Sequence, residues 1–298
     1  MTKTPLISIG MPAYNSADNI GFTIEGLLAQ SFGDFEVIIS DNASTDSTRD
    51  VVESYMKLDS RIRYERQPVN IGANPNWSHV ARRARGELFK WSSSSDWCAP
   101  TFLERCKNEL LAHDDTVLVV PRTRLFQGNV NVAQDYESDL EVTDESPSVR
   151  LEHLMTKLCL NNLMNGLIRM SALKKTRLME RYHGGDVVLM GHLVLQGKFR
   201  LLDDRLFYRR MEPTTATALQ DRTAVRRFHY PQLGAQSLFQ YTKCQVGWVR
   251  TVLAPPMPLR ERRRALLFVA KRCYWERVGF LEDARGVWRF VTRRDMSA

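Results

Sequence analysis

Cysteine is scarce in this chain and follows no recognisable pattern. The five cysteines are an odd number, they lie far apart, and none forms a Cys-x-x-Cys pair. This excludes a zinc ribbon and a disulfide framework, and it favours a reducing cytoplasm. Long apolar runs are also missing. None approaches the roughly 18 residues that span a bilayer, and Leu6–Ile9 is too short for the apolar core of a signal peptide. We therefore expect a cytoplasmic protein without a spanning segment.

Acidic residues are outnumbered by basic ones. The 298 residues include 42 Lys and Arg against 34 Asp and Glu, which gives a formal net charge of +8. Internal repeats are absent, and four consecutive serines are the only low-complexity tract. A basic balance favours anionic partners, which include phosphorylated ligands, an anionic membrane surface and nucleic acid. No recognisable nucleic-acid motif is present, so we expect no nucleic-acid partner.

Short apolar runs alternate with amphipathic helical patterns through the first part of the chain. Because the runs are continuously apolar, the alternation predicts an α/β fold with a mostly parallel sheet covered by helices on both faces. The polar loops at the carboxyl ends of the strands then gather along one edge. The predicted strands are Leu6–Met11, Phe35–Ser40, Ile62–Glu65, Glu87–Trp91 and Thr116–Val120, and the helices between them include Trp77–Arg85 and Thr101–Ala112.

The second part of the chain is less regular. Gln127–Val149 is polar and acidic and predicts an irregular excursion, which Ser146 and Pro147 end by opening a helix. Further along, short apolar runs alternate with helical patterns, and everything beyond Pro213 is helical and basic. The predicted elements are a strand at Leu163–Arg169, helices at Ala172–Glu180 and Val187–Gln196, and strands at Phe199–Leu202 and Arg205–Arg209.

One stretch, Gly86–Pro100, carries the most distinctive chemistry. A buried strand runs into four serines and then a lone carboxylate, Asp96, before Pro100 introduces a helix. A carboxylate just past the carboxyl end of a strand lies where open α/β sheets bind ligands, so Asp96 is a candidate metal or phosphate-site residue. The alternative is a serine-rich turn with no role in binding.

Three segments resemble family 2 glycosyltransferases in order and spacing. They are Ile7–Asn15 (ISIGMPAYN), Glu36–Asp46 (EVIISDNASTD) and the Asn-x-Gly turn Asn70–Gly72. The resemblance covers roughly residues 5 to 125 and extends more weakly to about Pro213. It implies a GT-A fold with a Rossmann-like nucleotide-binding half at residues 1–125 and an acceptor-binding half at residues 126–213. A basic helical extension then covers residues 214–298.

The resemblance also implies a reaction. A sugar passes from a nucleoside diphosphate-sugar donor to an acceptor hydroxyl with inversion, and the acceptor is a saccharide, a lipid-linked group or a small molecule. Such a protein would act in the synthesis of a surface polysaccharide, a glycolipid or a glycosylated natural product. A processive membrane synthase is not expected, because the Gln-x-x-Arg-Trp signature is missing.

Donor-binding residues follow from the resemblance at matching positions. Pro12, Ala13, Tyr14 and Asn15 would line the nucleotide, and Asp41 would accept hydrogen bonds from its base. Plain turn roles are the alternative for all five. Asp46 would contact the donor or cap the next helix. The turn with Asn70, Gly72 and Asn74 would approach the nucleotide, or Gly72 would simply supply a positive φ.

The resemblance places an acidic Asp-x-Asp signature, which holds Mn²⁺ or Mg²⁺ against the diphosphate, at the serines. Here the sequence reads Ser94-Ser95-Asp96, so only the last carboxylate remains. Asp96 would bind the metal with Ser95 beside the donor. Affinity would be reduced, because serine hydroxyls are weak ligands for hard cations. Alternatively, Arg209 and Arg210 would neutralise the leaving diphosphate instead, unless they are surface charges.

The resemblance assigns the catalytic base to Asp186, which precedes a predicted helix and would otherwise serve as its N-cap. His183 and His192 are weaker candidates as metal ligands and are more typical of surface or packing positions. Trp91 and Trp97 fit the core or a site wall better than a stacking platform for sugar.

Two other functions remain open from the sequence. The serines in place of acids fit a non-catalytic nucleotide-sugar-binding or scaffolding homologue, although Asp41, Asp96 and Asp186 argue against it. A nucleotidyltransferase is a weaker fit, because the loop after the first strand lacks a glycine-rich basic motif. Aromatic residues among the arginines of the last helices fit either an anionic membrane surface or packing on the catalytic domain.

Overall fold

The computed structural model describes residues 4–212, 222–232 and 234–292 and contains one nine-stranded sheet. Strand β1 lies between β2 and β4, with β3 outside β2, and all four run parallel. Strands β1, β2 and β4 are buried on both faces, which is why they are mostly apolar in sequence, whereas the edge strand β3 is half-buried. Their bounds are Ile7–Ala13 (β1), Phe35–Asp41 (β2), Ile62–Arg66 (β3) and Leu88–Trp91 (β4).

The remaining strands extend the sheet in the order β4-β8-β6-β9-β5. Strand β8 runs antiparallel to both neighbours, whereas β6 and β9 are parallel to each other. The prediction of a mostly parallel α/β sheet flanked by helices is therefore confirmed, and the antiparallel strands are β8 and the two short strands β5 and β7. These strands are Trp97–Cys98 (β5), Thr116–Phe126 (β6), Gln134–Asp135 (β7, paired with β6), Leu167–Arg169 (β8) and Lys198–Arg210 (β9).

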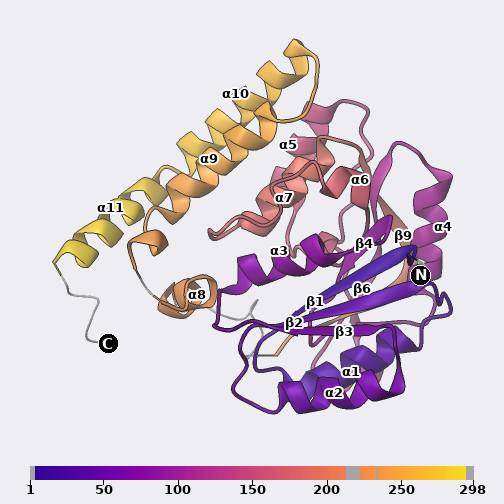
Figure 1. Cartoon of the computed structure of the whole chain (residues 1–298). Helices are drawn as coiled ribbons and strands as arrows, with labels where there is room; N and C mark the ends of the chain where they lie inside the picture. The colour runs from indigo at the N-terminus through magenta and orange to yellow at the C-terminus, as the bar shows by residue number, and fades with distance from the viewer. Residues whose placement is uncertain (1–3, 213–221, 233, 293–298) are drawn as a thin grey trace.

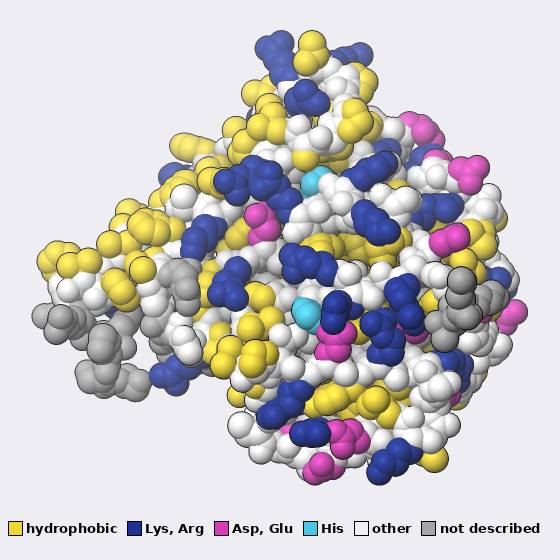
Figure 2. All heavy atoms as spheres, in the orientation of Figure 1, with side chains coloured by type: hydrophobic (Ala, Val, Ile, Leu, Met, Phe, Trp, Pro, Cys, Tyr) yellow, Lys and Arg dark blue, Asp and Glu magenta, His cyan; other side chains and the backbone are white. Residues whose placement is uncertain are grey.

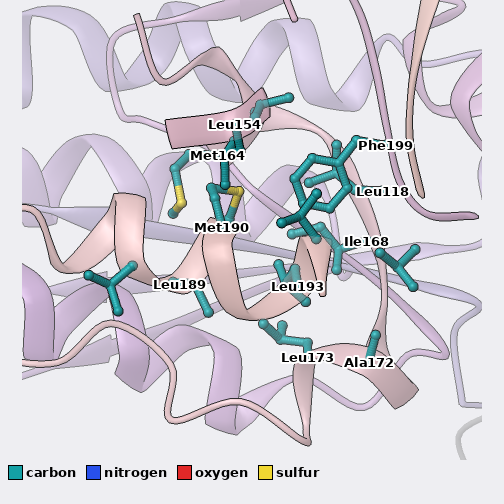
Figure 3. Packing of buried hydrophobic residues seen from close by; sticks show 14 of the residues in the cluster. Leu118, Leu154, Met164, Ile168, Ala172, Leu173, Leu189, Met190, Leu193 and Phe199 are labelled. Carbon is teal, nitrogen blue, oxygen red and sulfur yellow. The ribbon is translucent and has the colours of Figure 1, made fainter. Parts of the chain in front are cut away.

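Helices cover both faces of the sheet (Figure 1). On one face α1 and α2 pack with α4 over β1 and β2. On the other, α3, α5 and α7 enclose a second apolar cluster, in which Leu118 and Phe199 meet Met190 and Leu193 (Figure 3). The bounds are Ala17–Leu28 (α1), Thr48–Leu58 (α2), Ala73–Arg83 (α3), Phe102–Ala112 (α4), Pro147–Lys157 (α5), Met170–Leu173 (α6) and Gly185–Val194 (α7).

Several predicted boundaries are wrong in the second half. The helix expected at Ala172–Glu180 is only α6, because the Thr176 hydroxyl donates to the Leu173 carbonyl (2.7 Å) and the chain then turns through Leu178 at φ +57°. The strand expected from Leu163 begins at Leu167, after a 3₁₀ turn at Asn162–Asn165. The two strands expected between Phe199 and Arg209 are one strand, β9, interrupted in register rather than broken.

The excursion at Gln127–Val149 is irregular, as expected. It contains a 3₁₀ turn at Val130–Val132, the short β7 and a single bridge from Val142 to Phe199. Ser146 accepts a hydrogen bond from the Val149 N–H and so caps α5, which confirms the predicted helix start. The segment therefore lies against the edge of the second half, near β6 and β9.

The C-terminal region is helical, as predicted, and forms an arm that projects from the domain (Figure 1). Trp248 of α9 packs on Gly191 of α7, and Glu261 of α10 accepts hydrogen bonds from Ser146 and Ser148 of α5. Helix α11 buries none of its residues. The predicted boundary at 213–214 lies outside the described residues. The helices are Arg222–His229 (α8), Gln240–Leu253 (α9), Leu259–Trp275 (α10) and Val278–Val291 (α11), with a 3₁₀ turn at Ala235–Ser237.

No helix among the described residues has the length and apolarity that crossing a membrane requires.

Candidate active site

The loops after β1 and β2 are joined into one surface at the carboxyl edge of the sheet. Pro12 and Ala13 are buried as the last residues of β1, whereas Tyr14 and Asn15 are exposed. Asn15 adopts φ +47°, accepts a hydrogen bond from the Thr45 N–H (2.9 Å) and donates its own N–H to Ser44 (2.9 Å). Of the predicted nucleotide-lining segment, Tyr14 and Asn15 are therefore the residues that face outward.

Asp41 is fully buried at the end of β2 and organises the loop that follows. Its Oδ1 accepts the Ser44 N–H at 2.8 Å and its Oδ2 accepts the Tyr64 hydroxyl at 2.6 Å, with Arg66 Nε at 3.4 Å. Burial and the hydrogen bond to Asp41 raise the pKa of Tyr64, which keeps the phenol a donor. The contact of Asp41 with a nucleotide base stays a prediction. In the structure its carboxylate holds the loop after β2 against Tyr64 of β3.

Asp46 stabilises the start of two helices. Its Oδ2 accepts the Ala17 N–H at the start of α1 (3.0 Å), and its Oδ1 accepts the backbone N–H and hydroxyl of Thr48 at the start of α2 (3.0 and 2.5 Å). Burial acts against ionisation, but the hydrogen bonds from Thr48 and Ala17 lower the pKa of Asp46 overall. This geometry supports the capping alternative for Asp46, while its contact with a donor stays a prediction.

The turn at Asn70–Gly72 is held by a residue that sequence reasoning missed, Asn42. Its Nδ2 donates to Asn70 Oδ1 (2.8 Å) and its Oδ1 accepts the Ile71 N–H (2.9 Å). Gly72 has φ +87°, and a Cβ there would lie 2.3 Å from the carbonyl oxygen of His229. The signal for Asn42 was its place directly after Asp41 at a strand end.

Asn74 is occupied by protein contacts. Its Nδ2 donates to the carbonyls of Glu180 (2.7 Å) and Tyr182 (2.9 Å), and its Oδ1 bonds to His229 Nδ1 (2.9 Å). The residue is buried, so it ties α3 to the segment that leads into α7. Burial and the nearby His183 lower the pKa of His229 to about 4, despite the opposing effect of Asp186. His229 is therefore neutral when it bonds to Asn74.

The serine loop, which comprises Ser92–Ser95 and Asp96, is held in place by hydrogen bonds within the loop and to neighbouring residues. Ser93 and Ser95 share a hydrogen bond between their hydroxyls (3.1 Å), and Ser94 bonds to Ser16 at the start of α1 (2.8 Å). Asp96 is buried, and its Oδ1 accepts the backbone N–H of Arg210 at the end of β9 (2.9 Å). Burial raises the pKa of Asp96, against the effects of that N–H and of nearby cations.

A divalent cation fits this loop poorly. Asp96 is its only carboxylate, and one of its oxygens already accepts from Arg210. Across the ranges that the structure describes, no group of three His, Cys, Asp or Glu side chains could hold a metal. Binding of Mn²⁺ or Mg²⁺ at Asp96 therefore stays a prediction. One carboxylate among serine hydroxyls is a weak set of ligands for such a cation.

The two arginines at the end of β9 differ in their surroundings. The Arg210 guanidinium donates to the Ser95 carbonyl (3.1 Å) and to Glu212 (2.7 Å), and lies over the rings of Phe22 and Phe126. Its side chain is 10% exposed, so it is not a surface charge. Arg209 donates to Asn162 Oδ1 at 2.6 Å. Both arginines act on the charge of Asp96, so they lie beside the serine loop.

Asp186 is the second residue of α7 and is half-buried. Gly184, at φ +81°, is the residue that precedes the helix, and no side chain caps it. The N-cap alternative for Asp186 is therefore wrong, because the left-handed glycine takes that place. Asp186 Oδ2 instead accepts a hydrogen bond from Asn161 Nδ2 at 2.8 Å. The side-chain oxygen of Asn161, Oδ1, is buried without a hydrogen-bond partner among the described residues.

The structure gives His192, Trp91 and Trp97 packing positions and leaves His183 near the surface. His192 is buried in α7, where burial lowers its pKa, and His183 is exposed with its ring 5.8 Å from that of His229. Trp91 is fully buried and donates to the Trp77 carbonyl (2.9 Å). Trp97 packs edge-on against Tyr208, with ring centroids 4.9 Å apart, and also stacks on Phe22 of α1.

Two adjacent asparagines, Asn161 and Asn162, connect the separate parts of the site. Asn162 bonds to Arg209, next to the residue whose N–H bonds to Asp96, and Asn161 bonds to Asp186. Residues from the loop before β5, from β9, from the 3₁₀ turn with its N-cap and from α7 are therefore linked by these hydrogen bonds and by the chain itself. Neither asparagine belongs to a motif that we singled out, because a pair of asparagines in sequence is also typical of an ordinary turn.

Comparison with known proteins identifies relatives of this arrangement. The sequence model described as glycosyl transferase family 2 matches residues 8–179. The putative teichuronic acid biosynthesis glycosyltransferase TuaG of Bacillus subtilis is 38% identical over 92 residues, which are 31% of this chain and 36% of TuaG. A GalNAc(5)-diNAcBac-PP-undecaprenol beta-1,3-glucosyltransferase of Campylobacter jejuni is 25% identical over 226 residues, 74% of this chain and 70% of that protein.

Solved structures are similar over most of the chain. S. aureus TarS 1-349 in complex with UDP-GlcNAc superposes with a TM-score of 0.66 at 16% identity and covers 90% of this chain and 72% of that one. The same protein in complex with UDP gives 0.62 at 18% identity. This similarity shows a shared GT-A fold. The chain spans about a third of the length of TuaG. Since the family model spans more than half of the chain, the protein belongs to glycosyl transferase family 2.

Proposed function

We propose that this protein is an inverting glycosyltransferase that moves a sugar from a nucleoside diphosphate donor to an acceptor hydroxyl, in the synthesis of a surface polysaccharide or glycolipid. The observation that carries the proposal is the placement of Asp186. Its carboxylate is half-buried, free of a capping role and oriented by Asn161, in a network that continues to Arg209 and the serine loop. The polysaccharide and glycolipid names of the relatives support the acceptor class.

The chemistry requires one base and one stabilised leaving group. Asp186 takes the proton of the acceptor hydroxyl as its oxygen attacks the anomeric carbon of the sugar. The bond from that carbon to the diphosphate breaks, and the electron pair leaves with the diphosphate. Because attack and departure occur on opposite faces of the carbon, the configuration inverts. Asn161 holds the carboxylate in one orientation, which is how a base is kept within reach of its proton.

The non-catalytic alternative has little support from the geometry. A scaffold would not require Asp186 to lie outside the cap position of α7 with a dedicated amide donor. The donor is a separate question. TarS, whose structures contain UDP and UDP-GlcNAc, shares the fold, and this makes UDP-sugars the first donors to test.

A donor panel tests the proposal. We expect one nucleoside diphosphate-sugar to raise the thermal unfolding midpoint, because a ligand at 100 times its Kd stabilises the folded state by about 2.7 kcal/mol. The panel comprises UDP-, GDP-, CDP- and dTDP-sugars, with the matching nucleoside monophosphates as controls for binding of the base alone. The absence of a shift with every donor, in the presence and absence of Mn²⁺, would favour the scaffold instead.

We further propose a cytoplasmic protein that binds the inner face of an anionic membrane through its C-terminal arm. Aromatic side chains on α10 and α11 are largely exposed, with Trp275 at 61% and Trp288 at 66%. Figure 2 shows hydrophobic side chains gathered along this arm. The exposed arginines Arg263, Arg277 and Arg289 complement anionic headgroups, whereas a protein partner would not require this charge.

Vesicle co-sedimentation tests this location with the full chain. We expect binding to vesicles that contain phosphatidylglycerol, weaker binding to phosphatidylcholine alone, and a loss of roughly tenfold or more in the double variant Trp275→Ser and Trp288→Ser, since two rings no longer insert. The matched control is Leu58→Ser with Leu111→Ser, two exposed apolar residues away from the arm. Equal sedimentation of all forms would overturn the proposal, and a change in oligomeric state instead would assign the arm to a second copy of the chain.

A further inference from the structure

The serine loop has more basic than acidic neighbours. Asp96 lies beside Arg209 and Arg210 and near Lys90, and all three cations act on its charge. Lys90 is fully buried below the loop, where its Nζ donates to the carbonyls of Trp91 and Asn165, each at 2.9 Å. Two carboxylates, Asp96 and Glu212, contact this group through Arg210. The loop therefore has three cations and two anions at its base.

Such an environment disfavours a divalent cation and suits an anion. A metal needs several oxygen ligands with negative charge, and here serines stand where the acidic signature is expected. A serine hydroxyl is a weak ligand for Mn²⁺ or Mg²⁺, but it donates a hydrogen bond to a phosphate oxygen without repulsion. The hydroxyls of Ser93 and Ser95 bond to each other and that of Ser94 bonds to Ser16, which holds the three side chains in one cluster. A hydroxyl hydrogen rotates to suit its acceptor, so each can turn from its present partner to a bound phosphate oxygen.

Arg210 and Arg209 have different tasks in this cluster. Arg210 fixes the loop, since its backbone N–H holds Asp96 and its guanidinium holds the Ser95 carbonyl from a nearly buried position. Arg209 extends to Asn162, the neighbour of the asparagine that orients Asp186. Through these two asparagines the Arg209 guanidinium is linked to the candidate base, and the next residue of β9, Arg210, holds Asp96 of the serine loop.

We infer that this protein binds the donor diphosphate without a divalent cation, with the Arg209 guanidinium and the hydroxyls of the serine loop holding its anionic oxygens. The inference deepens the proposed glycosyl transfer and rests on it. As the anomeric carbon–oxygen bond breaks, the electron pair moves to the diphosphate, and Arg209 stabilises that charge by hydrogen bonds from a permanent cation. Compared with the acidic signature expected here, the serines remove ligands for a metal, and the nearby arginines supply positive charge for the diphosphate. Both differences favour binding of an anion without a metal.

Calorimetric titration with UDP, GDP and dTDP tests this inference. The wild-type chain is titrated after dialysis against EDTA and again with Mn²⁺, and we expect the affinity for the preferred nucleotide to agree within about threefold. Arg209→Gln should lose about tenfold to a hundredfold in affinity under both conditions, because one charged hydrogen-bond donor is removed. Ser95→Asp should weaken binding in EDTA and recover part of it with Mn²⁺, since the acid restores a metal ligand.

A matched control distinguishes loss of the Arg209 contact with the diphosphate from a general effect of removing an arginine from β9. Arg205→Gln lies on the same strand β9, where Arg205 pairs with Glu137 and Asp135, and it should bind nucleotide like the wild type. Circular dichroism checks that each variant folds. Binding by the wild type only with Mn²⁺ would overturn the metal-free inference and leave the proposed function intact. Wild-type affinity in Arg209→Gln would overturn the assignment of that cation. No binding of any nucleotide under either condition would overturn both the inference and the proposed function.

Discussion

Replacing Asp186 with asparagine is expected to lower the rate of sugar transfer by about 10²- to 10⁴-fold, which is the usual contribution of a positioned general base. Asparagine has nearly the same shape, and its carbonyl oxygen can still accept from Asn161. It cannot take a proton from the acceptor. Nucleotide affinity should therefore stay close to that of the wild type, while turnover measured by release of the nucleoside diphosphate falls.

The control for this substitution is Asp203→Asn. Asp203 lies on β9 with a side chain that is 97% exposed and paired only loosely with Arg122 (3.4 Å). It should leave both turnover and binding unchanged. If Asp186→Asn turns over like the wild type, another group is the base. If it loses nucleotide affinity as well as turnover, Asp186 contributes to binding rather than to proton transfer.

Replacing Trp91 with alanine is expected to lower the free energy of unfolding by about 3–5 kcal/mol, the range for large aromatic residues in a core. Trp91 is fully buried, its ring lies edge-on to Phe89 at 4.7 Å, and its Nε1 donates to the Trp77 carbonyl. The alanine leaves a cavity and a carbonyl without its donor. Urea unfolding, followed by tryptophan fluorescence and circular dichroism, measures the change.

Two further variants divide this effect into its causes. Trp91→Phe keeps a ring against Phe89 but removes the donor to Trp77, so it should cost about 1–3 kcal/mol from the unpaired carbonyl and the smaller ring. Trp288→Ala removes the same atoms from an exposed position and should change the stability by no more than about 0.5 kcal/mol. A value for Trp91→Ala no larger than that of Trp288→Ala would show that the residue does not support the core.

The first half of the fold could be predicted because each strand carries its own signal. Phe35–Asp41 is apolar at four of its first five residues, Glu36 being the exception, and Ile62–Arg66 follows a clear turn. The strand β5 could not be predicted, because Trp97 and Cys98 have no pattern of their own and pair with Tyr208 and Phe207 only through tertiary contact. Strand β8 lies within the predicted strand Leu163–Arg169, but its direction, opposite to both neighbours, could not be predicted.

The candidate site could likewise be predicted only in part from the sequence. Asp96 was proposed as a site residue from its position after an apolar run, and Asp41 and Asp186 were proposed from the resemblance. Asn42 and Asn161 were missed, because each acts by donating to a residue distant in sequence, and an asparagine in a loop has many ordinary uses. Asp46 and Asn74 were candidates for ligand contact, but in the structure both bond to backbone and side-chain groups of the protein.

The hydrogen bond from the Arg210 N–H to Asp96 joins residues 114 positions apart. Contacts of such long range form late, because a large loop must close before they contribute. The neighbouring strands β1, β2 and β3 are complete early in synthesis, but the serine loop lacks its contacts with Arg210 until β9 has been synthesised. A nascent chain that ends before Arg210 therefore lacks the donor that completes this loop, and the order of synthesis delays the assembly of the site to the last strand of the sheet.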